Sequence, residues 1–189
     1  MRTQDRARNW LSYLLLGGGA LLLFHGARDV IESRWGQHEA ARAFAKALPR
    51  PADGPESRVQ PGDTVAKLII PRLHVELYVV EGTDPADLRI GPGHLTGTAM
   101  PGEEGNCVIA GHRDTHFRIL EQIRRGDPVI LETGNGRFVY RVKQAAVVSP
   151  TNTASLAPAP GVLHLITCYP FFYVGSAPKR FVVEAQLTS

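Results

Sequence analysis

The sequence predicts a mainly β fold, a closed barrel or a sandwich, over roughly the last 125 residues. The segments that follow residue 63 are short, rich in Val and Ile, and bounded by Gly, Pro, Asn or Asp, which is typical of β-strands. Seven or eight such strands in one domain-sized stretch fit either architecture. The predicted strands cover 64–70, 75–80, 106–111, 127–133, 137–148, 162–168 and 180–187.

Helical patterns are few in the connections between these strands. Only "PADLRIG" (85–91) and "HFRILEQIRR" (116–125) have the pattern of helical turns. The segment "ETGNGRF" predicts a tight hairpin with Asn135-Gly136 at its tip, because this dipeptide readily adopts the left-handed turn conformation.

The N-terminal part of the chain predicts a single membrane anchor. Residues 9–27 contain no Asp, Glu, Lys or Arg, and these 19 residues would span roughly 28 Å as a helix. Because Arg2, Arg6 and Arg8 precede this stretch, the N-terminus is expected in the cytoplasm and the rest of the chain outside it. A cleaved signal peptide is the alternative, but no convincing small-x-small cleavage site follows the apolar run.

The chain divides into three parts. Residues 1–48 form the cytoplasmic tip, the anchor and a helical stalk that begins near residue 29. Residues 49–63 hold four prolines and two glycines among polar residues, which indicates a linker. Residues 64–189 form the predicted β domain.

Composition excludes several classes of protein. With 43% apolar and 21% charged residues the chain is expected to fold. A net charge of +3, with no run of Lys and Arg, does not indicate a nucleic-acid partner. Two cysteines allow at most one disulfide, so a reactive thiol remains possible.

Cys168 is the candidate nucleophile, because it ends an apolar strand directly before a Tyr-Pro turn. A nucleophilic thiol needs a base nearby. His164 lies about 13 Å back on the same strand, too far to act, whereas His112 ends the strand "NCVIAG" and would meet Cys168 if the two strands end side by side. The alternatives are a small core cysteine and a loop histidine.

A metal site is not expected, and neither is a cofactor. His112 and His116 have the i, i+4 spacing of a metal-binding helix. However, "HRDTH" lacks the Glu of a metalloprotease helix, and no third ligand is evident.

Two longer segments resemble the sortase family, and class D within it: "TCYPFFYVGSAPKRFVV" and "GPGHLTGTAMPGEEGNCVIAGHRDTHF". The family's Thr-Leu-x-Thr-Cys signature corresponds to residues 164–168, with His164 in place of the first Thr. The catalytic His corresponds to His112, and the catalytic Arg, about a dozen residues after the Cys, corresponds to Arg180. The similarity covers about residues 63–187 and implies an eight-stranded sortase β-barrel and a transpeptidase.

The resemblance also implies a mechanism and partners. Cys168 would attack the Thr carbonyl of a Leu-Pro-x-Thr-type sorting signal near the C-terminus of a secreted protein. Arg180 would stabilise the oxyanion, and His112 would protonate the leaving amine. An amine from a cell-wall precursor or another protein would then accept the acyl group, which attaches the secreted protein to the cell surface.

Three further residues have a predicted role. Thr167, beside the nucleophile, and His94, where the family often has His, are candidate substrate-binding residues. By strand alternation Thr167 would point into the barrel, which favours a role in holding the strand, and His94 could equally be structural in its loop. Cys107 is expected to be a buried small residue rather than the partner of Cys168 in a disulfide.

The competing functions are other extracytoplasmic cysteine enzymes and a tethered binding module. A cell-wall L,D-transpeptidase has a His just before the nucleophile, where this chain has Ile166 and Thr167. A papain-like hydrolase needs a His downstream of the Cys, and none follows Cys168. A membrane-tethered binding module without catalysis would leave the thiol unreactive.

Overall fold

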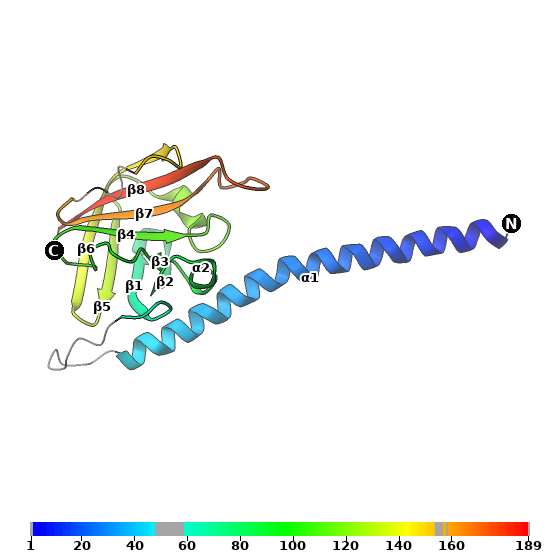
Figure 1. The fold of residues 1–189 in the computed structure, drawn as a ribbon, viewed down its shortest axis with the longest axis horizontal. Helices are drawn as coiled ribbons and strands as arrows, with labels where there is room; N and C mark the ends of the chain where they lie inside the picture. The colour runs from blue at the N-terminus through cyan, green and yellow to red at the C-terminus, as the bar shows by residue number, and fades with distance from the viewer. Residues whose placement is uncertain (1, 48–58, 154–156, 158, 189) are drawn as a thin grey trace.

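The computed structural model describes residues 2–47, 59–153, 157 and 159–188, and within the N-terminal helix it leaves out the side chains of 2–9, 11, 12, 25–27, 29, 30 and 47. A long helix precedes a compact β-barrel with short helical turns (Figure 1). The elements are α1 (Arg2–Ala47), β1 (Thr64–Ile70), η1 (Pro71–Leu73), β2 (Val75–Glu81), α2 (Pro85–Ile90), β3 (Gly93–His94), β4 (Asn106–Gly111), η2 (Arg118–Gln122), β5 (Pro128–Thr133), β6 (Gly136–Val148), β7 (Val162–Tyr169) and β8 (Lys179–Leu187).

The described strands form a closed barrel in the order β1-β2-β3-β4-β7-β8-β6-β5, with β5 pairing back onto β1. This confirms the mainly β prediction and decides between its two alternatives in favour of the barrel. Two neighbouring pairs are parallel, β2 with β3 and β4 with β7, and the others are antiparallel. All seven predicted strands are present, and the sequence missed only the two-residue β3.

The hairpin between β5 and β6 is shifted by one residue from the prediction. Thr133 pairs with Gly136, so Gly134 and Asn135 form the tip. Gly136 has φ 150°, which suits the start of β6 and which a side chain would strain.

The barrel interior is filled by alternate residues of each strand, as the period of two requires. The connection from β4 to β5 adds Phe117 and Leu120 to the same cluster, both fully buried. The inward residues of the strands are Ala66, Leu68, Ile70, Val79, Cys107, Ile109, Val129, Leu131, Tyr140, Val142, Leu163, Leu165, Val183 and Ala185.

The C-terminal turns of α1 pack on the barrel rather than standing apart as a stalk (Figure 1). Ala40 and Phe44 are buried there, and the Phe44 ring meets the Tyr78 ring edge-on. The Gln37 side chain donates to the Tyr78 carbonyl at 2.9 Å and accepts from the Tyr78 amide at 2.8 Å. Since β3 pairs with β2 only at Val80 and Glu81, Gln37 supplies the hydrogen bonds that a longer β3 would have made.

The N-terminal half of α1 extends away from the barrel (Figure 1). Within the described residues, no helix is long and apolar enough to cross a membrane, so the anchor predicted over residues 9–27 is not confirmed. Most of the predicted linker 49–63 lies outside the described residues, and its last residues form a turn that hydrogen-bonds to β2 through Gly62 and Asp63.

Candidate active site

Strand pairing aligns the three predicted catalytic residues in a row. Cys168 on β7 pairs directly with Arg180 on β8. On the other side of β7, Thr167 pairs with Gly111, the last residue of β4, so His112 follows at the level of Cys168. Cys168 alternates with the inward-facing Thr167 and is therefore on the outer face of the barrel, where it is partly exposed.

Thr167 joins the ends of β4 and β7. Its side chain is 2% exposed, and its hydroxyl donates to the Gly111 carbonyl at 2.7 Å. The bond connects the residue before Cys168 to the residue before His112. Thr167 thus lies inward, as the alternation indicated, and its hydroxyl is used within the protein, so we assign no substrate contact to it.

The loop that carries His112 folds back onto a buried aromatic ring. The Phe117 amide donates to the His112 carbonyl at 2.9 Å, which closes residues 112–117 into a turn. A Cβ on Gly111 would come within 2.7 Å of the Phe117 ring, so a glycine is needed for this close approach. The buried ring therefore fixes the backbone that presents His112.

Two arginines of the His112 loop hold the connection between β7 and β8. The Arg113 guanidinium donates through one nitrogen to the Tyr173 and Gly175 carbonyls at 2.8 and 2.9 Å. The Arg118 guanidinium lies over the Phe172 ring, 4.0 Å from its centroid. Sequence reasoning missed both contacts, because an Arg in a loop gives no sign of the carbonyl or ring it meets.

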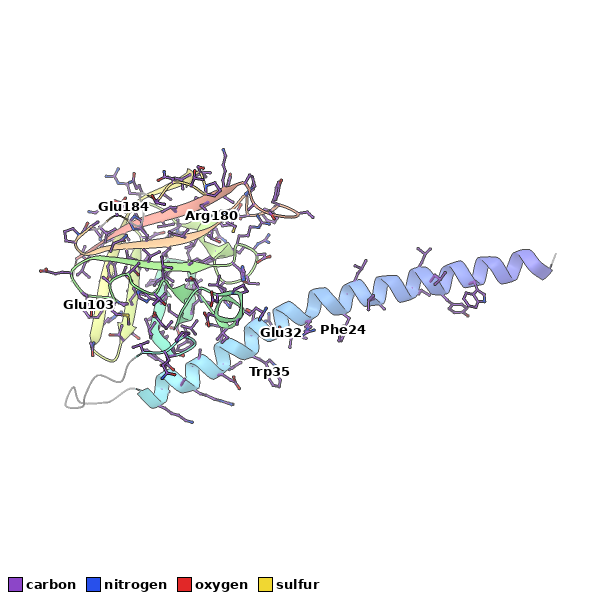
Figure 2. The ribbon with its side chains drawn as sticks, in the orientation of Figure 1. Phe24, Glu32, Trp35, Glu103, Arg180 and Glu184 are labelled. Carbon is purple, nitrogen blue, oxygen red and sulfur yellow. The ribbon has the colours of Figure 1, made fainter. Side chains whose placement is uncertain are left out.

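Arg180 is the second residue of β8, and Figure 2 shows it on the same strand as Glu184. Its guanidinium donates to the carbonyls of Lys179 at 3.1 Å and Ala177 at 3.5 Å. The bond to Lys179 has an ordinary length, whereas the contact to Ala177 is at the limit of hydrogen-bond length, and both lie within the connection that leads into β8. The Arg180 side chain is partly buried, and its residue pairs with Cys168 across the two strands.

The two cysteines are in different environments, and both are free. Cys107 points into the barrel and is 2% exposed, and burial raises the pKa of its thiol to about 12. Cys107 is therefore a protonated core residue at neutral pH, as expected. Cys168 is on the opposite face of the barrel wall and reaches solvent, which a nucleophile requires.

His116 contacts the long helix α1. Its side chain is 7% exposed, and its Nε2 lies 2.8 Å from the Ser33 hydroxyl. Burial, helped by the neighbouring His112, lowers the pKa of His116 to about 4. His116 therefore joins the loop that carries His112 to the long helix.

His94 is buried inside the protein rather than lining the outer face. Its Nδ1 lies 2.7 Å from a Glu81 carboxylate oxygen, and its Nε2 lies 3.1 Å from both the Ala99 carbonyl and the Thr98 hydroxyl. Both ring nitrogens are engaged in the fold, which matches the structural alternative for this residue. We assign no substrate contact to it.

Comparison with known proteins agrees with this geometry. The model of the sortase domain matches residues 68–188, which is most of the chain and all of the barrel except residues 64–67 at the start of β1. The chain belongs to the sortase family. Sortases are cysteine transpeptidases, so the resemblance inferred from the sequence is confirmed at the level of the family.

Named relatives give the same result. The chain is 40% identical to sortase D of Bacillus subtilis over 127 residues, which are 66% of this chain and 64% of that protein. It is 35% identical to sortase SrtE1 of Streptomyces coelicolor over 148 residues, which are 68% of this chain and 41% of that one. The match therefore spans less than two thirds of the length of either relative.

Solved structures share the fold. A Clostridium perfringens sortase D5 transpeptidase superposes with a TM-score of 0.67 at 27% identity, covering 84% of this chain and 99% of that one. The catalytic domain of B. anthracis SrtD gives a TM-score of 0.62 at 32% identity, covering 74% and 97%.

The Thr167 hydroxyl is predicted to stabilise the junction of β4 and β7. Thr167→Val keeps the side chain's shape but leaves the Gly111 carbonyl without this donor, which should cost about 1–3 kcal/mol in the free energy of unfolding. Thr167→Ser keeps the hydroxyl and is the matched control. Urea unfolding of both variants and of the wild-type protein measures the difference, and a Val variant as stable as the wild type would contradict the assignment.

His116 is predicted to make the protein less stable in acid. Folded His116 binds fewer protons than unfolded His116 between about pH 4 and 6.5, so the free energy of unfolding falls as the pH falls through this window. Between pH 7 and pH 5 the loss should be about 2 kcal/mol. His116→Asn cannot titrate, so its stability should fall less over this range in urea unfolding. Equal losses in both proteins would show that His116 is already charged in the folded state.

Proposed function

We propose that this chain is a transpeptidase that uses Cys168 as its nucleophile, His112 as acid and base, and Arg180 as the oxyanion donor. The observation that supports it is the register of β4, β7 and β8, in which Arg180 and His112 flank the partly exposed Cys168. A binding module would not require a row of nucleophile, base and cation on three neighbouring strands.

The first half of the reaction forms a thioester. Cys168 gives its proton to His112, and its sulfur bonds to the carbonyl carbon of the attacked residue. The C–N bond then breaks, and His112 returns the proton to the leaving amine. Every proton and electron pair is thus accounted for without a metal or cofactor.

Arg180 would act on the oxyanion between these two steps. Its guanidinium carries a permanent charge and a planar set of donors, which suits a developing negative oxygen. To reach that oxygen it has to release its contacts to the Lys179 and Ala177 carbonyls. The oxyanion carries a full negative charge, so the guanidinium binds it more strongly than it binds neutral carbonyl oxygens.

The second half transfers the acyl group to an amine. A primary amine attacks the thioester carbon, His112 takes its proton, and the thiolate leaves. The proposed acyl donor is a secreted protein with a Leu-Pro-x-Thr-type sorting signal.

We further propose that the chain is held at the cell membrane with the barrel outside the cytoplasm. In the extended half of α1, large apolar side chains are exposed on all sides, among them Leu14 at 65%, Leu22 at 75% and Phe24 at 68% (Figure 2). A helix that is apolar all round requires an apolar environment, and a lipid bilayer is one. In this arrangement the barrel would meet secreted proteins as they leave the cell.

The catalytic assignment is tested by trapping the acyl-enzyme with a sorting-signal peptide and measuring its mass. Cys168→Ala should form none, and His112→Ala nearly none. Arg180→Ala should lower the rate by about 10²–10³-fold, and Arg180→Lys should recover only part of it. Cys107→Ala is the matched control and should retain activity. If Cys107→Ala were inactive while Cys168→Ala remained active, the assignment of Cys168 as the nucleophile would be wrong.

Transfer is separated from hydrolysis by adding short glycyl, alanyl or diaminopimelyl amines to the same assay. A transpeptidase should turn over faster and yield a product that contains both peptides. If every saturating amine left the rate unchanged and only the free acid formed, the enzyme would be a thiol hydrolase, which is the alternative function.

The location is tested with a reporter fused after Ser189. The reporter should be active only outside the cytoplasm, and the protein should sediment with membranes. A mature N-terminus near residue 28 would instead indicate a cleaved signal peptide.

A further inference from the structure

The outer face that carries Cys168 continues along β6, β8 and β7 as a three-stranded surface. Pairing of these strands forms three rungs, one at the catalytic residues, one apolar and one polar. Side chains of successive rungs are two residues apart on each strand, so all three rungs face the same way. The rungs are Val148–Arg180–Cys168, Ala146–Val182–Ile166 and Gln144–Glu184–His164.

A small pocket opens at the polar end of this surface. Its volume is about 160 Å³, and it is lined by the polar rung, the apolar residues of β6 and β8, and Asn152. This volume corresponds to roughly five water molecules of liquid, which suits one side chain rather than a whole peptide. Among the described residues that line it, Glu184 is the only one that carries a full charge at neutral pH.

His164 presents an acceptor to this pocket. The side chain is 6% exposed, and its Nδ1 lies 2.7 Å from the Asn106 amide oxygen. The Asn106 amide nitrogen donates to the Ala157 carbonyl, which fixes the orientation of the amide. Nδ1 therefore carries the proton, and Nε2 has a lone pair. Burial lowers the pKa of His164, partly opposed by Glu184, which keeps the ring neutral.

Glu184 presents a second acceptor beside the first. Its Oε2 lies 3.9 Å from His164 Nε2, which is too long for a hydrogen bond. The same carboxylate accepts from the Gln144 side chain at 2.9 Å, which holds it in place. Two acceptors that face each other at this distance favour a donor between them. The described residues contain no group of three possible metal ligands, so a cationic side chain fits the pair better than zinc.

We propose that this pocket binds a Lys or Arg side chain of the sorting signal, about four residues before the attacked Thr. The inference rests on the proposed function, because it places the peptide at Cys168. An ammonium or guanidinium would donate to His164 Nε2 and pair with the Glu184 carboxylate. The position is the one directly before the Leu in a Leu-Pro-x-Thr signal.

Spacing along the strands gives this position. His164 is four residues from Cys168, which is about 13 Å at roughly 3.3 Å per residue. An extended peptide has nearly the same rise, so its fifth residue from the scissile bond reaches the polar rung. The middle rung, with Ile166 and Val182, lies beneath the residues between and suits the apolar part of the signal.

The proposal is tested with three peptides that differ only before the Leu, where they carry Lys, norleucine or Glu. For the acyl-transfer reaction, kcat/KM should be about tenfold higher with Lys than with norleucine, and lowest with Glu. Glu184→Gln should bring the Lys and norleucine values together. Glu104→Gln, which neutralises an exposed carboxylate outside the pocket, should keep the tenfold preference.

Binding is measured separately with Cys168→Ala, by fluorescence anisotropy of the same labelled peptides. The Lys peptide should bind more tightly than the norleucine peptide, and adding Glu184→Gln should remove the difference. Equal binding of the two peptides, or tighter binding of the Glu peptide, overturns the pocket whether or not the enzyme turns over. If the Lys peptide bound more tightly but the wild type formed no acyl-enzyme, the proposed function would be overturned and the proposed binding pocket would be retained.

Discussion

The in-register parallel pairing of β4 with β7 is the constraint on which the rest of the site depends. Parallel strands that start level also end level, so the residues that follow them emerge at one edge. The pairing of Gly111 with Thr167, and the hydroxyl bond between them, bring His112 beside Cys168. A shift of one residue would turn Cys168 into the core and bring Thr167 outside.

The alternation of side chains across the barrel wall places the proposed reactive residues outside and the core residues inside. Cys107 and Cys168 lie on neighbouring strands but on opposite faces, so one thiol is packed with apolar side chains and the other reaches solvent. The same alternation places Cys168, Ile166 and His164 in one line outside. A peptide that follows this line meets the nucleophile, then apolar side chains, then the polar pocket.

The sequence predicted those parts of the fold that have a local pattern. Val- and Ile-rich runs gave all seven longer strands, whereas β3 has only two residues and no pattern of its own. Cys168 and His112 could be argued from strand ends, but Arg180 needed the family resemblance, because an Arg beside a Lys on a strand has no distinctive pattern. The contacts of Ser33 and Gln37 with the barrel could not be predicted, since each depends on a backbone or ring far away in the sequence.

The side chain of Gln37 has a consequence for the self-association of the protein. A strand with bare amides and carbonyls recruits strands from other molecules, and proteins commonly cover such edges. Here the Gln37 side chain on α1 makes the hydrogen bonds of a neighbouring strand for one residue of β2. A barrel without α1 would leave the Tyr78 amide and carbonyl of β2 without their Gln37 partner. The helix therefore also protects the barrel against self-association and aggregation.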